Sequence, residues 1–247
     1  MATTRVRVAL KVYSEPLTVE GNAPQGEARL DEILPVFRKV DDAVIDRAIA
    51  RVESNGEKVS CSKGCSACCR AQPVPITPPE AAAIARLVEL MPEPRQSEVR
   101  AAFAERVAGL HSAGLYDMLL HREQSLSREE ARELANRYFR LGLVCPFLVD
   151  DACSIYEDRP FVCRQYLVTS PVPLCSDPLH NPVKPVPIPM RFATGMLTVA
   201  EQSFGRPQHT VPLVLALEYA EAHREELDCR FDGRETFGRF MKALASD

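Results

Sequence analysis

The sequence of 247 residues contains no tryptophan, and its aromatic share is only 6%. Proteins that bind single-stranded nucleic acids stack the bases on aromatic side chains, so a base-stacking surface is not expected. The net charge at pH 7 is −4, from 30 basic and 34 acidic residues. Such a charge offers no electrostatic attraction for nucleic acid or for an anionic membrane. We therefore expect neither of them as a partner.

Long apolar stretches are missing as well. No window approaches the roughly 18 apolar residues of a transmembrane helix, and the first residues contain no apolar region long enough for a signal peptide. We therefore expect a cytoplasmic protein in a reducing compartment. Under those conditions nine cysteines are more readily metal ligands than disulfides, and their odd number points the same way.

The motifs of several large enzyme classes are also absent. The sequence contains no G-x-G-x-x-G, P-loop, G-x-S-x-G or H-E-x-x-H pattern. Its five histidines are scattered, and none is spaced as a metal-binding pair. Two acidic pairs, Asp150-Asp151 and Glu157-Asp158, are explained by a turn and by the capping of a helix. Catalytic residues are therefore not assigned from the sequence.

Cysteine is the residue type that stands out. Four cysteines lie within nine residues, in the run Cys61-Ser-Lys-Gly-Cys65-Ser-Ala-Cys68-Cys69. Spacings of three and two residues allow one tight loop to direct several sulfur atoms to a common point, as a tetrahedral metal site requires. Gly64 suits the positive φ that such a turn often needs. A second set follows downstream and consists of Cys145, Cys153 and Cys163, with Cys175 behind it.

The adjacent pair Cys68 and Cys69 limits what the first set can do alone. Neighbouring side chains point about 180° apart in a strand and about 100° apart in a helix, so these two thiols are expected to diverge. We expect a metal site that takes part of the first set and is completed by Cys145, Cys153 or Cys163. Seven cysteines also leave room for a second metal or a bridging thiolate.

Two other interpretations of cysteines remain open. One is that a cysteine is an ordinary small apolar residue of the core. This interpretation fits Cys229, and it is also open for Cys175. A redox-active dithiol at Cys65-x-x-Cys68 would be expected to open a helix after a strand in a βαβ unit, and the sequence supplies no such context. Metal binding is the interpretation that uses all four clustered cysteines.

Basic residues accompany the candidate ligands. Four thiolates around Zn²⁺ or around an oxidised [4Fe–4S] core leave a net charge of about −2, which is costly to bury unless it is balanced. Lys63, Arg70, Arg159 and Arg164 all lie within four residues of a candidate ligand. For Lys63 and Arg70 an ordinary solvated position is an equally good explanation.

Apolar periodicity and capping signals predict a mainly α fold with minor β-structure. Residues 5–13 are expected to form one strand, and residues 21–26 a loop. The apolar spacing over residues 30–54 is helical, and the continuous helix is expected to start only at Pro35, with the proline in its first turn. The other helices are expected over residues 77–91, 96–111, 115–122, 127–141, 159–167, 211–227 and 234–244.

Local signals mark several ends of these elements. Asn55-Gly56 and Gly142 are expected to end helices, and Thr77 and Ser127 begin capping boxes with a glutamate three residues later. Asp158 is expected to cap the helix that carries Cys163. The further predictions are a hairpin or compact loop over 144–155, no regular structure in the proline-rich residues 171–189, and either helix or strand over 191–203.

We expect these elements to form one compact helical domain around a metal site built from loops at helix ends. Residues 1–57 would supply a strand and a helix, and residues 58–168 the cysteine-bearing region. Residues 169–247 would supply a proline-rich wrap and the closing helices.

Several segments together resemble the CxxxCxxCC cysteine-cluster proteins over about residues 58–168. Besides the run Cys61–Cys69, they are Ile76-Thr-Pro-x-Glu80, Cys145-Pro-Phe-Leu, Cys153-x-Ile-Tyr and Arg159-Pro-x-x-Cys163-Arg-x-Tyr166. This family comprises zinc- or iron-chelating and Fe–S-cluster-containing proteins, including flagellin lysine N-methylase relatives. The resemblance implies a metal-binding set of Cys61, Cys65, Cys68, Cys69, Cys145, Cys153 and Cys163. Cofactor contacts are expected from Arg159, Arg164 and Tyr166.

The expected function is that of a metal-binding protein with an iron–sulfur cluster, of the [4Fe–4S] type, or with zinc, in a redox or structural role. Two alternatives remain open. One is a cluster-dependent enzyme of the protein-lysine N-methylase type, acting on a protein substrate, although no S-adenosylmethionine or nucleotide motif is recognisable in the sequence. The other is a non-catalytic metal-handling or adaptor protein with a protein partner.

Overall fold

A computed structural model describes residues 2–70, 72–120 and 126–245. Helices, with the 3-10 turns included, account for 53% of the described residues, and the strands there form only small antiparallel sheets, which confirms the mainly α class. Within the described part, each sheet has two strands. None of the helices in that part combines the length and the apolar character needed to cross a lipid bilayer.

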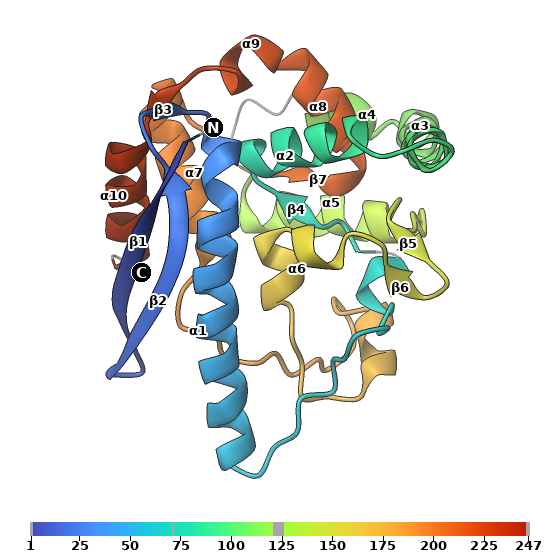
Figure 1. The fold of residues 1–247 in the computed structure, drawn as a ribbon. Helices are drawn as coiled ribbons and strands as arrows, with labels where there is room; N and C mark the ends of the chain where they lie inside the picture. The colour runs from blue at the N-terminus through green and yellow to red at the C-terminus, as the bar shows by residue number, and fades with distance from the viewer. Residues whose placement is uncertain (1, 71, 121–125, 246–247) are drawn as a thin grey trace.

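The N-terminal residues form a hairpin that lies against one side of a long helix (Figure 1). Strand β1 (Thr3–Val12) pairs with β2 (Glu15–Pro24), and α1 (Leu34–Ser54) follows the 3-10 turn η1 (Leu30–Ile33). The sequence predicted only one strand here. The loop predicted over residues 21–26 is wrong for the residues up to Pro24, because these belong to β2. The turn at Tyr13-Ser14 lacks glycine and asparagine, although both residues adopt a positive φ.

The remaining elements lie mostly on the other side of α1 and behind it (Figure 1). The helices are α2 (Pro78–Glu89), α3 (Arg95–Ser112), α4 (Tyr116–Leu120), α5 (Arg128–Phe139), α6 (Phe161–Gln165), α7 (Phe192–Phe204), α8 (Ala216–Ala222), α9 (Arg224–Leu227) and α10 (Gly233–Leu244). The short sheets pair β3 (Glu27–Ala28) with β8 (Phe231–Asp232), β4 (Pro75–Ile76) with β7 (Val211–Pro212), and β5 (Leu148–Val149) with β6 (Ala152–Cys153). The further 3-10 turns are η2 (Cys68–Arg70), η3 (Tyr156–Asp158), η4 (Val172–Ser176) and η5 (Leu213–Leu215).

Most predicted helix ends are confirmed. Pro35 lies in the first turn of α1, and Asn55 caps its C-terminus before Gly56, whose φ is 82°. The side chain of Ser127 accepts a hydrogen bond from the backbone of Glu130 at the start of α5. These signals involve neighbours along the chain, and for that reason the sequence reveals them.

Other boundaries differ from the prediction. The helix expected over 211–227 is wrong as one unit, because it is divided into β7, η5, α8 and α9. Val211 and Pro212 pair with β4, a long-range contact that periodicity alone does not contain. The ambiguous stretch 191–203 is helical, and the predicted hairpin over 144–155 turns at Asp150-Asp151. Helix α4 ends at Leu120, and residues 121 and 122 of the predicted helix lie outside the described residues.

The short sheets connect segments that are distant in the sequence. The β3–β8 pair joins the beginning of the chain to its last part, and β4–β7 joins the cysteine-bearing region to that same part. The expected division into residues 1–57, 58–168 and 169–247 stays a prediction.

Two phenylalanines anchor the segments that carry the second cysteine set. Phe147, two residues after Cys145, is fully buried and meets the ring of Phe103 at 5.5 Å. Phe161, two residues before Cys163, is also fully buried and lies 5.6 Å from the ring of Phe192. The two anchors lie in different apolar cores, one around α2, α3 and α8 and the other around α1, α7 and α10. The cysteines are therefore held at the junction of the two cores.

The carboxylate of Glu80 joins the starts of α2 and α6. Glu80 is fully buried and accepts hydrogen bonds from the backbone N–H and the hydroxyl of Thr77, both at 2.8 Å, and from the N–H of Phe161 at 2.7 Å. Burial raises the pKa of Glu80, while these donors and the nearby Arg38 cation lower it. The predicted capping residue thus also binds the helix that carries Cys163.

Helix α6 is further attached to α1 by polar side chains. Arg164 donates to Asp42 at 2.6 Å, and Gln165 donates to Oδ1 of Asp41 at 2.8 Å. The other carboxylate oxygen of Asp41 is buried and has no hydrogen-bond partner in the described part of the chain. Asp41 therefore carries an incompletely satisfied carboxylate at the α1–α6 contact.

Asp158 does not cap α6, which corrects the prediction. It accepts a hydrogen bond from Arg38 of α1 at 3.0 Å, and α6 begins after Pro160 without a side-chain cap. The ion pair with a largely buried arginine outweighs the local capping preference of the aspartate.

We predict that Glu80→Ala destabilises the protein. The N–H groups of Thr77 and Phe161 lose their buried acceptor, which is expected to lower the free energy of unfolding by about 3 kcal/mol. Urea unfolding followed by circular dichroism measures this change. The exposed Glu89 at the other end of α2 is the control, and Glu89→Ala is expected to change the stability by no more than about 0.5 kcal/mol. Equal effects of the two substitutions would contradict the role of Glu80.

We also predict that Asp41 makes stability depend on pH. Burial raises the pKa of Asp41 well above its usual range, so the folded protein binds more protons than the unfolded chain between the two pKa values. Stability therefore falls as the pH rises through this interval, by at most about 1.4 kcal/mol per pH unit. In Asp41→Asn this part of the slope should disappear in urea unfolding series at successive pH values. Glu53→Gln, at an exposed position on the same helix, should keep the slope.

Candidate metal centre

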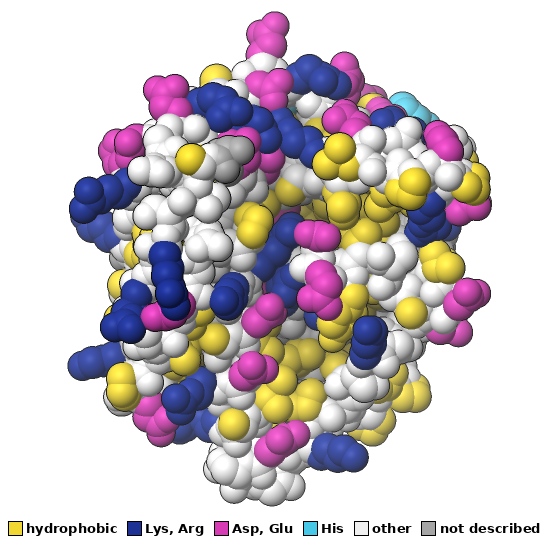
Figure 2. Space-filling model, in the orientation of Figure 1, with side chains coloured by type: hydrophobic (Ala, Val, Ile, Leu, Met, Phe, Trp, Pro, Cys, Tyr) yellow, Lys and Arg dark blue, Asp and Glu magenta, His cyan; other side chains and the backbone are white. Residues whose placement is uncertain are grey.

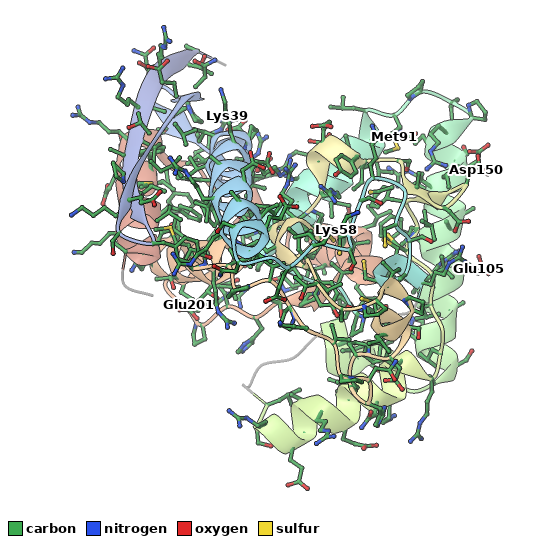
Figure 3. All side chains as sticks on the ribbon, turned by 90° about the horizontal axis from the view of Figure 1, so that it is seen from below. Lys39, Lys58, Met91, Glu105, Asp150 and Glu201 are labelled. Carbon is green, nitrogen blue, oxygen red and sulfur yellow. The ribbon has the colours of Figure 1, made fainter. Side chains whose placement is uncertain are left out.

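The cysteine-bearing segments lie together on one side of the molecule. They are the loop after α1, the β5–β6 hairpin, α6 and η4 (Figure 1). Viewed from below, sulfur-bearing side chains gather between the loop after Lys58 and the hairpin that carries Asp150 (Figure 3). The fold thus brings two cysteine sets, which are some 80 residues apart in sequence, to the same region.

The first set lies on a loop with tight turns. The N–H of Cys65 donates to the carbonyl of Ser62, and that of Cys69 to the carbonyl of Ser66, both at 3.0 Å. Gly64 has a φ of 93°, as the turn was predicted to need. The four cysteines of this loop are all partly exposed.

Cys68 and Cys69 do not diverge, in contrast to the expectation. The two thiols lie within hydrogen-bonding reach of each other in η2. This thiol–thiol contact, followed by burial, raises the pKa of Cys68 far above its usual range.

A backbone hydrogen bond joins the two sets. The N–H of Cys145 donates to the carbonyl of Cys69 at 2.7 Å. On the same segment, the N–H of Ser154 donates to the carbonyl of Phe147 at 2.9 Å and closes the β5–β6 hairpin beside Cys153. Cys145 and Cys153 are thereby fixed next to the first loop.

Cys68 acts electrostatically on several other thiols of the region. Burial raises the pKa of five other thiols, and the neighbouring Cys68 sulfur raises each of them further. These thiols belong to Cys61, Cys145, Cys153, Cys163 and Cys175. The pKa of Cys145 reaches about 12 and that of Cys175 about 11. Since mutual electrostatic effects fall off with distance, these thiols lie in the same region of the molecule as Cys68.

Cys61 is held by the segment that follows α6. Its sulfur accepts a hydrogen bond from the N–H of Val168 at 3.4 Å and lies 4.0 Å from the carbonyl oxygen of Tyr166. The N–H of Ser60 donates to the carbonyl of Val168 at 2.8 Å. The first cysteine of the run and the end of α6 are therefore adjacent.

The structure adds Cys175 to the region, which the sequence left outside the pattern. Cys175 is buried in η4, and its carbonyl accepts a hydrogen bond from the side chain of Gln72 at 3.1 Å. The sequence offered one signal for including Cys175, namely its position after the second cysteine set. The surrounding prolines weakened that signal, because they predicted no regular structure there. Cys229 lies exposed beyond α9, so the expectation that it is a buried apolar residue is wrong.

Positive charge reaches the cysteines mainly through Arg159. Its guanidinium carbon lies 3.6 Å from the centre of the Tyr156 ring, and Lys63 lies 5.4 Å from that ring. Burial raises the pKa of Cys153, and the Arg159 cation counteracts that rise. Arg70 instead forms an ion pair with Asp151. Arg159 is therefore placed to balance thiolate charge at Cys68 and Cys153, while the Arg106 cation counteracts the rise in the pKa of Cys145.

Arg164 and Tyr166 occupy different positions. Arg164 is buried, and its guanidinium is directed to Asp42 and to the carbonyl of Arg159. The Tyr166 hydroxyl accepts a hydrogen bond from the Gln72 side chain at 3.3 Å. Their predicted contacts with a cofactor stay predictions.

A cavity of about 290 Å³ adjoins the site between α1 and α6. Its walls include Cys61, Arg159 and Arg164, and its rim carries the exposed carboxylates of Asp42 and Glu157. Figure 2, in the orientation of Figure 1, shows acidic and basic side chains side by side in the hollow on this face. One cysteine of the first set is therefore accessible to small molecules.

The donor set fits zinc or iron by its chemistry, because both bind thiolates in fours. Across residues 2–70, 72–120 and 126–245, no three cysteine, histidine or acidic side chains stand together as a metal-holding group.

Comparison with known proteins identifies the cysteine-bearing region. Residues 60–177 match the family model CxxCxxCC, described as "Putative zinc- or iron-chelating domain". The match includes Cys175 and leaves out Cys229, and the chain has three residues, not two, between Cys61 and Cys65. No curated protein and no solved structure matches the chain, and the lysine N-methylase relationship receives no support. The cysteine-bearing region of this chain is therefore similar to the CxxCxxCC zinc- or iron-chelating domains.

Proposed function

We propose that the domain binds zinc or iron through thiolates drawn from both cysteine sets. The observation that carries this proposal is the hydrogen bond from Cys145 to Cys69, which holds the second set beside the first cysteine loop. The ligands would come from Cys61, Cys65, Cys68, Cys69, Cys145, Cys153 and Cys163. Cys175 is an additional candidate because its thiol is also a neighbour of Cys68.

An iron–sulfur cluster is the first form of the centre that we propose, and zinc is the second. The number of neighbouring thiols exceeds the four that one cluster or one zinc ion takes. A bound cluster would supply one-electron transfer, whereas zinc would supply a structural cross-link. Arg159 would balance part of the negative charge in either case, since its cation lies close enough to Cys68 and Cys153 to counteract the rise in their pKa values.

Access to Cys61 supports a second candidate function, that of a metal-dependent enzyme. The cavity of about 290 Å³ gives a small molecule a route to this thiol beside Arg159. A cluster-dependent enzyme of the protein-lysine N-methylase type would need such a route. Heat release on titration with S-adenosylmethionine would favour that reaction, and its absence would remove it.

The partial exposure of the first cysteine set supports a third candidate, a metal-handling or adaptor role. A metal held by partly exposed thiols can be transferred to another thiol ligand by exchange. Rapid loss of metal to a weak chelator would favour this role, whereas retention would favour a resident centre.

The first prediction of the proposal concerns metal content. Protein purified without oxygen should contain stoichiometric iron and sulfide with broad absorption near roughly 400 nm, or stoichiometric zinc without colour. Cys163→Ser should reduce the metal per chain several-fold and lower the thermal unfolding temperature, because metal binding is coupled to folding. Cys229→Ser is the matched control, since this cysteine is exposed and outside the domain. Full metal content in a double Cys65→Ser, Cys163→Ser variant would refute the ligand set.

The second prediction concerns metal removal. In the metal-loaded protein, iodoacetamide should modify Cys229 first, because it is the exposed cysteine and bears no metal. After a strong chelator removes the metal, Cys61, Cys65, Cys68 and Cys69 should become reactive, since they are partly exposed. Peptide mass spectrometry locates the modified residues. Unchanged reactivity of all four after metal removal would exclude them as ligands.

A further inference from the structure

Strand β1 lies at the edge of the N-terminal hairpin sheet. In the described part of the chain this sheet contains only β1 and β2, and β2 provides most of the hairpin's contacts with α1 and α10. The hairpin runs along α1 on the side away from the cysteine-bearing segments (Figure 1). A strand edge that is ten residues long is a template on which an extended chain can pair.

The register of the hairpin determines which residues face this edge. Val12 and Glu15 flank a two-residue turn and therefore form a hydrogen-bonded pair. Because hydrogen-bonded pairs alternate along an antiparallel ladder, the even-numbered residues of β1 bond to β2. The N–H of Gln25 donates to the carbonyl of Ala2 at 3.0 Å, which continues the same alternation. The backbone groups of the odd-numbered residues therefore point to the free edge, and none of the described residues pairs with them there.

Cations line the solvent face of this edge. The odd-numbered residues of β1, all of them exposed, are Thr3, Arg5, Arg7, Ala9 and Lys11. Arg5 and Arg7 share the carboxylate of Glu20 on β2, whereas Lys11 lies opposite Pro16. Figure 2 shows more basic than acidic side chains over the hairpin, although the whole chain has a net charge of −4. The edge is therefore locally cationic and suits a partner of opposite charge.

A second copy of the chain is a poor occupant of this edge. Antiparallel pairing of two β1 strands about Arg7 would place the two Arg7 side chains opposite each other, and pairing about Ala9 would place Arg7 opposite Lys11. Like charges directly opposite each other on paired strands are destabilising. An incoming strand with carboxylates at alternate positions would instead place each of them opposite a cation or opposite a small side chain. The charge pattern therefore selects an acidic strand.

We propose that the free edge of β1 binds an extended acidic segment of a partner protein, which joins the hairpin as a third, antiparallel strand. Its backbone would bond to the odd-numbered residues of β1, and acidic residues at every second position would lie opposite Arg5, Arg7 and Lys11. The residues between them would lie on the other face, beside Val6 and Leu10, whose partial exposure suits apolar side chains. The inference is independent of the metal centre, because β1 lies outside the matched cysteine-bearing region.

The test uses the full-length protein and the end-blocked peptide Glu-Val-Glu-Val-Glu-Val-Glu. The control peptide Glu-Glu-Val-Val-Val-Glu-Glu has the same composition without the alternation. In NMR titrations we expect the first peptide to bind saturably and to slow the hydrogen exchange of the Arg7 and Ala9 amides, because strand addition gives these N–H groups acceptors. No saturable binding, equal affinity for the control peptide or for an RNA oligonucleotide, or unchanged amide exchange would each overturn the proposal.

Two variants locate the binding. Lys11→Glu replaces an attraction by a repulsion and is expected to weaken binding of the alternating peptide about tenfold. Arg100→Glu, at an exposed position on α3, changes the net charge by the same amount and should keep the affinity. Ala9→Pro removes an N–H group that the β2 ladder does not use, and it should also weaken binding. Lys11→Glu keeps the proposal testable if the proline variant does not fold, and unchanged affinity in either folded variant would refute it.

Discussion

The buried carboxylate of Glu80 is the constraint on which the cysteine-bearing region depends. It lies at the start of α2, directly after the first cysteine loop, and it accepts the N–H of Phe161 at the start of α6. Because a fully buried carboxylate must be satisfied by donors, the two helix starts cannot separate without exposing it or leaving it unpaired. The distance between the first cysteine loop and Cys163 is thereby restricted.

The two phenylalanine anchors extend this restriction to the rest of the second cysteine set. Phe147 and Phe161 lie in different apolar cores, and each is two residues from a cysteine. The hydrogen bond from Cys145 to Cys69 then joins the segments between the cores. The region can therefore collect thiols from three parts of the chain, while packing elsewhere in the molecule supplies the stability that holds them. In this arrangement a metal ion would reinforce a contact that the fold has already formed.

The local part of the fold was predictable from the sequence. Pro35, Ser127 and Gly56 act on neighbours a few residues away, and the structure shows the expected helix ends at each of them. The second hairpin strand and the break at Pro212 were not predictable in this way. Both are stabilised by partners far along the chain, α10 for the hairpin, which also packs on α1, and β4 for Val211. Long-range pairing is not contained in periodicity or in capping signals.

For the metal centre, the sequence alone determined the chemistry: four cysteines in nine residues, a second set downstream, and the match to a metal-chelating family. Only the tertiary structure decided which thiols are neighbours. It placed Cys69 beside Cys145, brought the buried Cys175 into the region and left Cys229 at the surface. It also turned Arg159 to the cysteines and Arg164 to α1. Ligand type follows from residue identity, whereas the direction of a side chain follows from the helices and cores that hold its backbone.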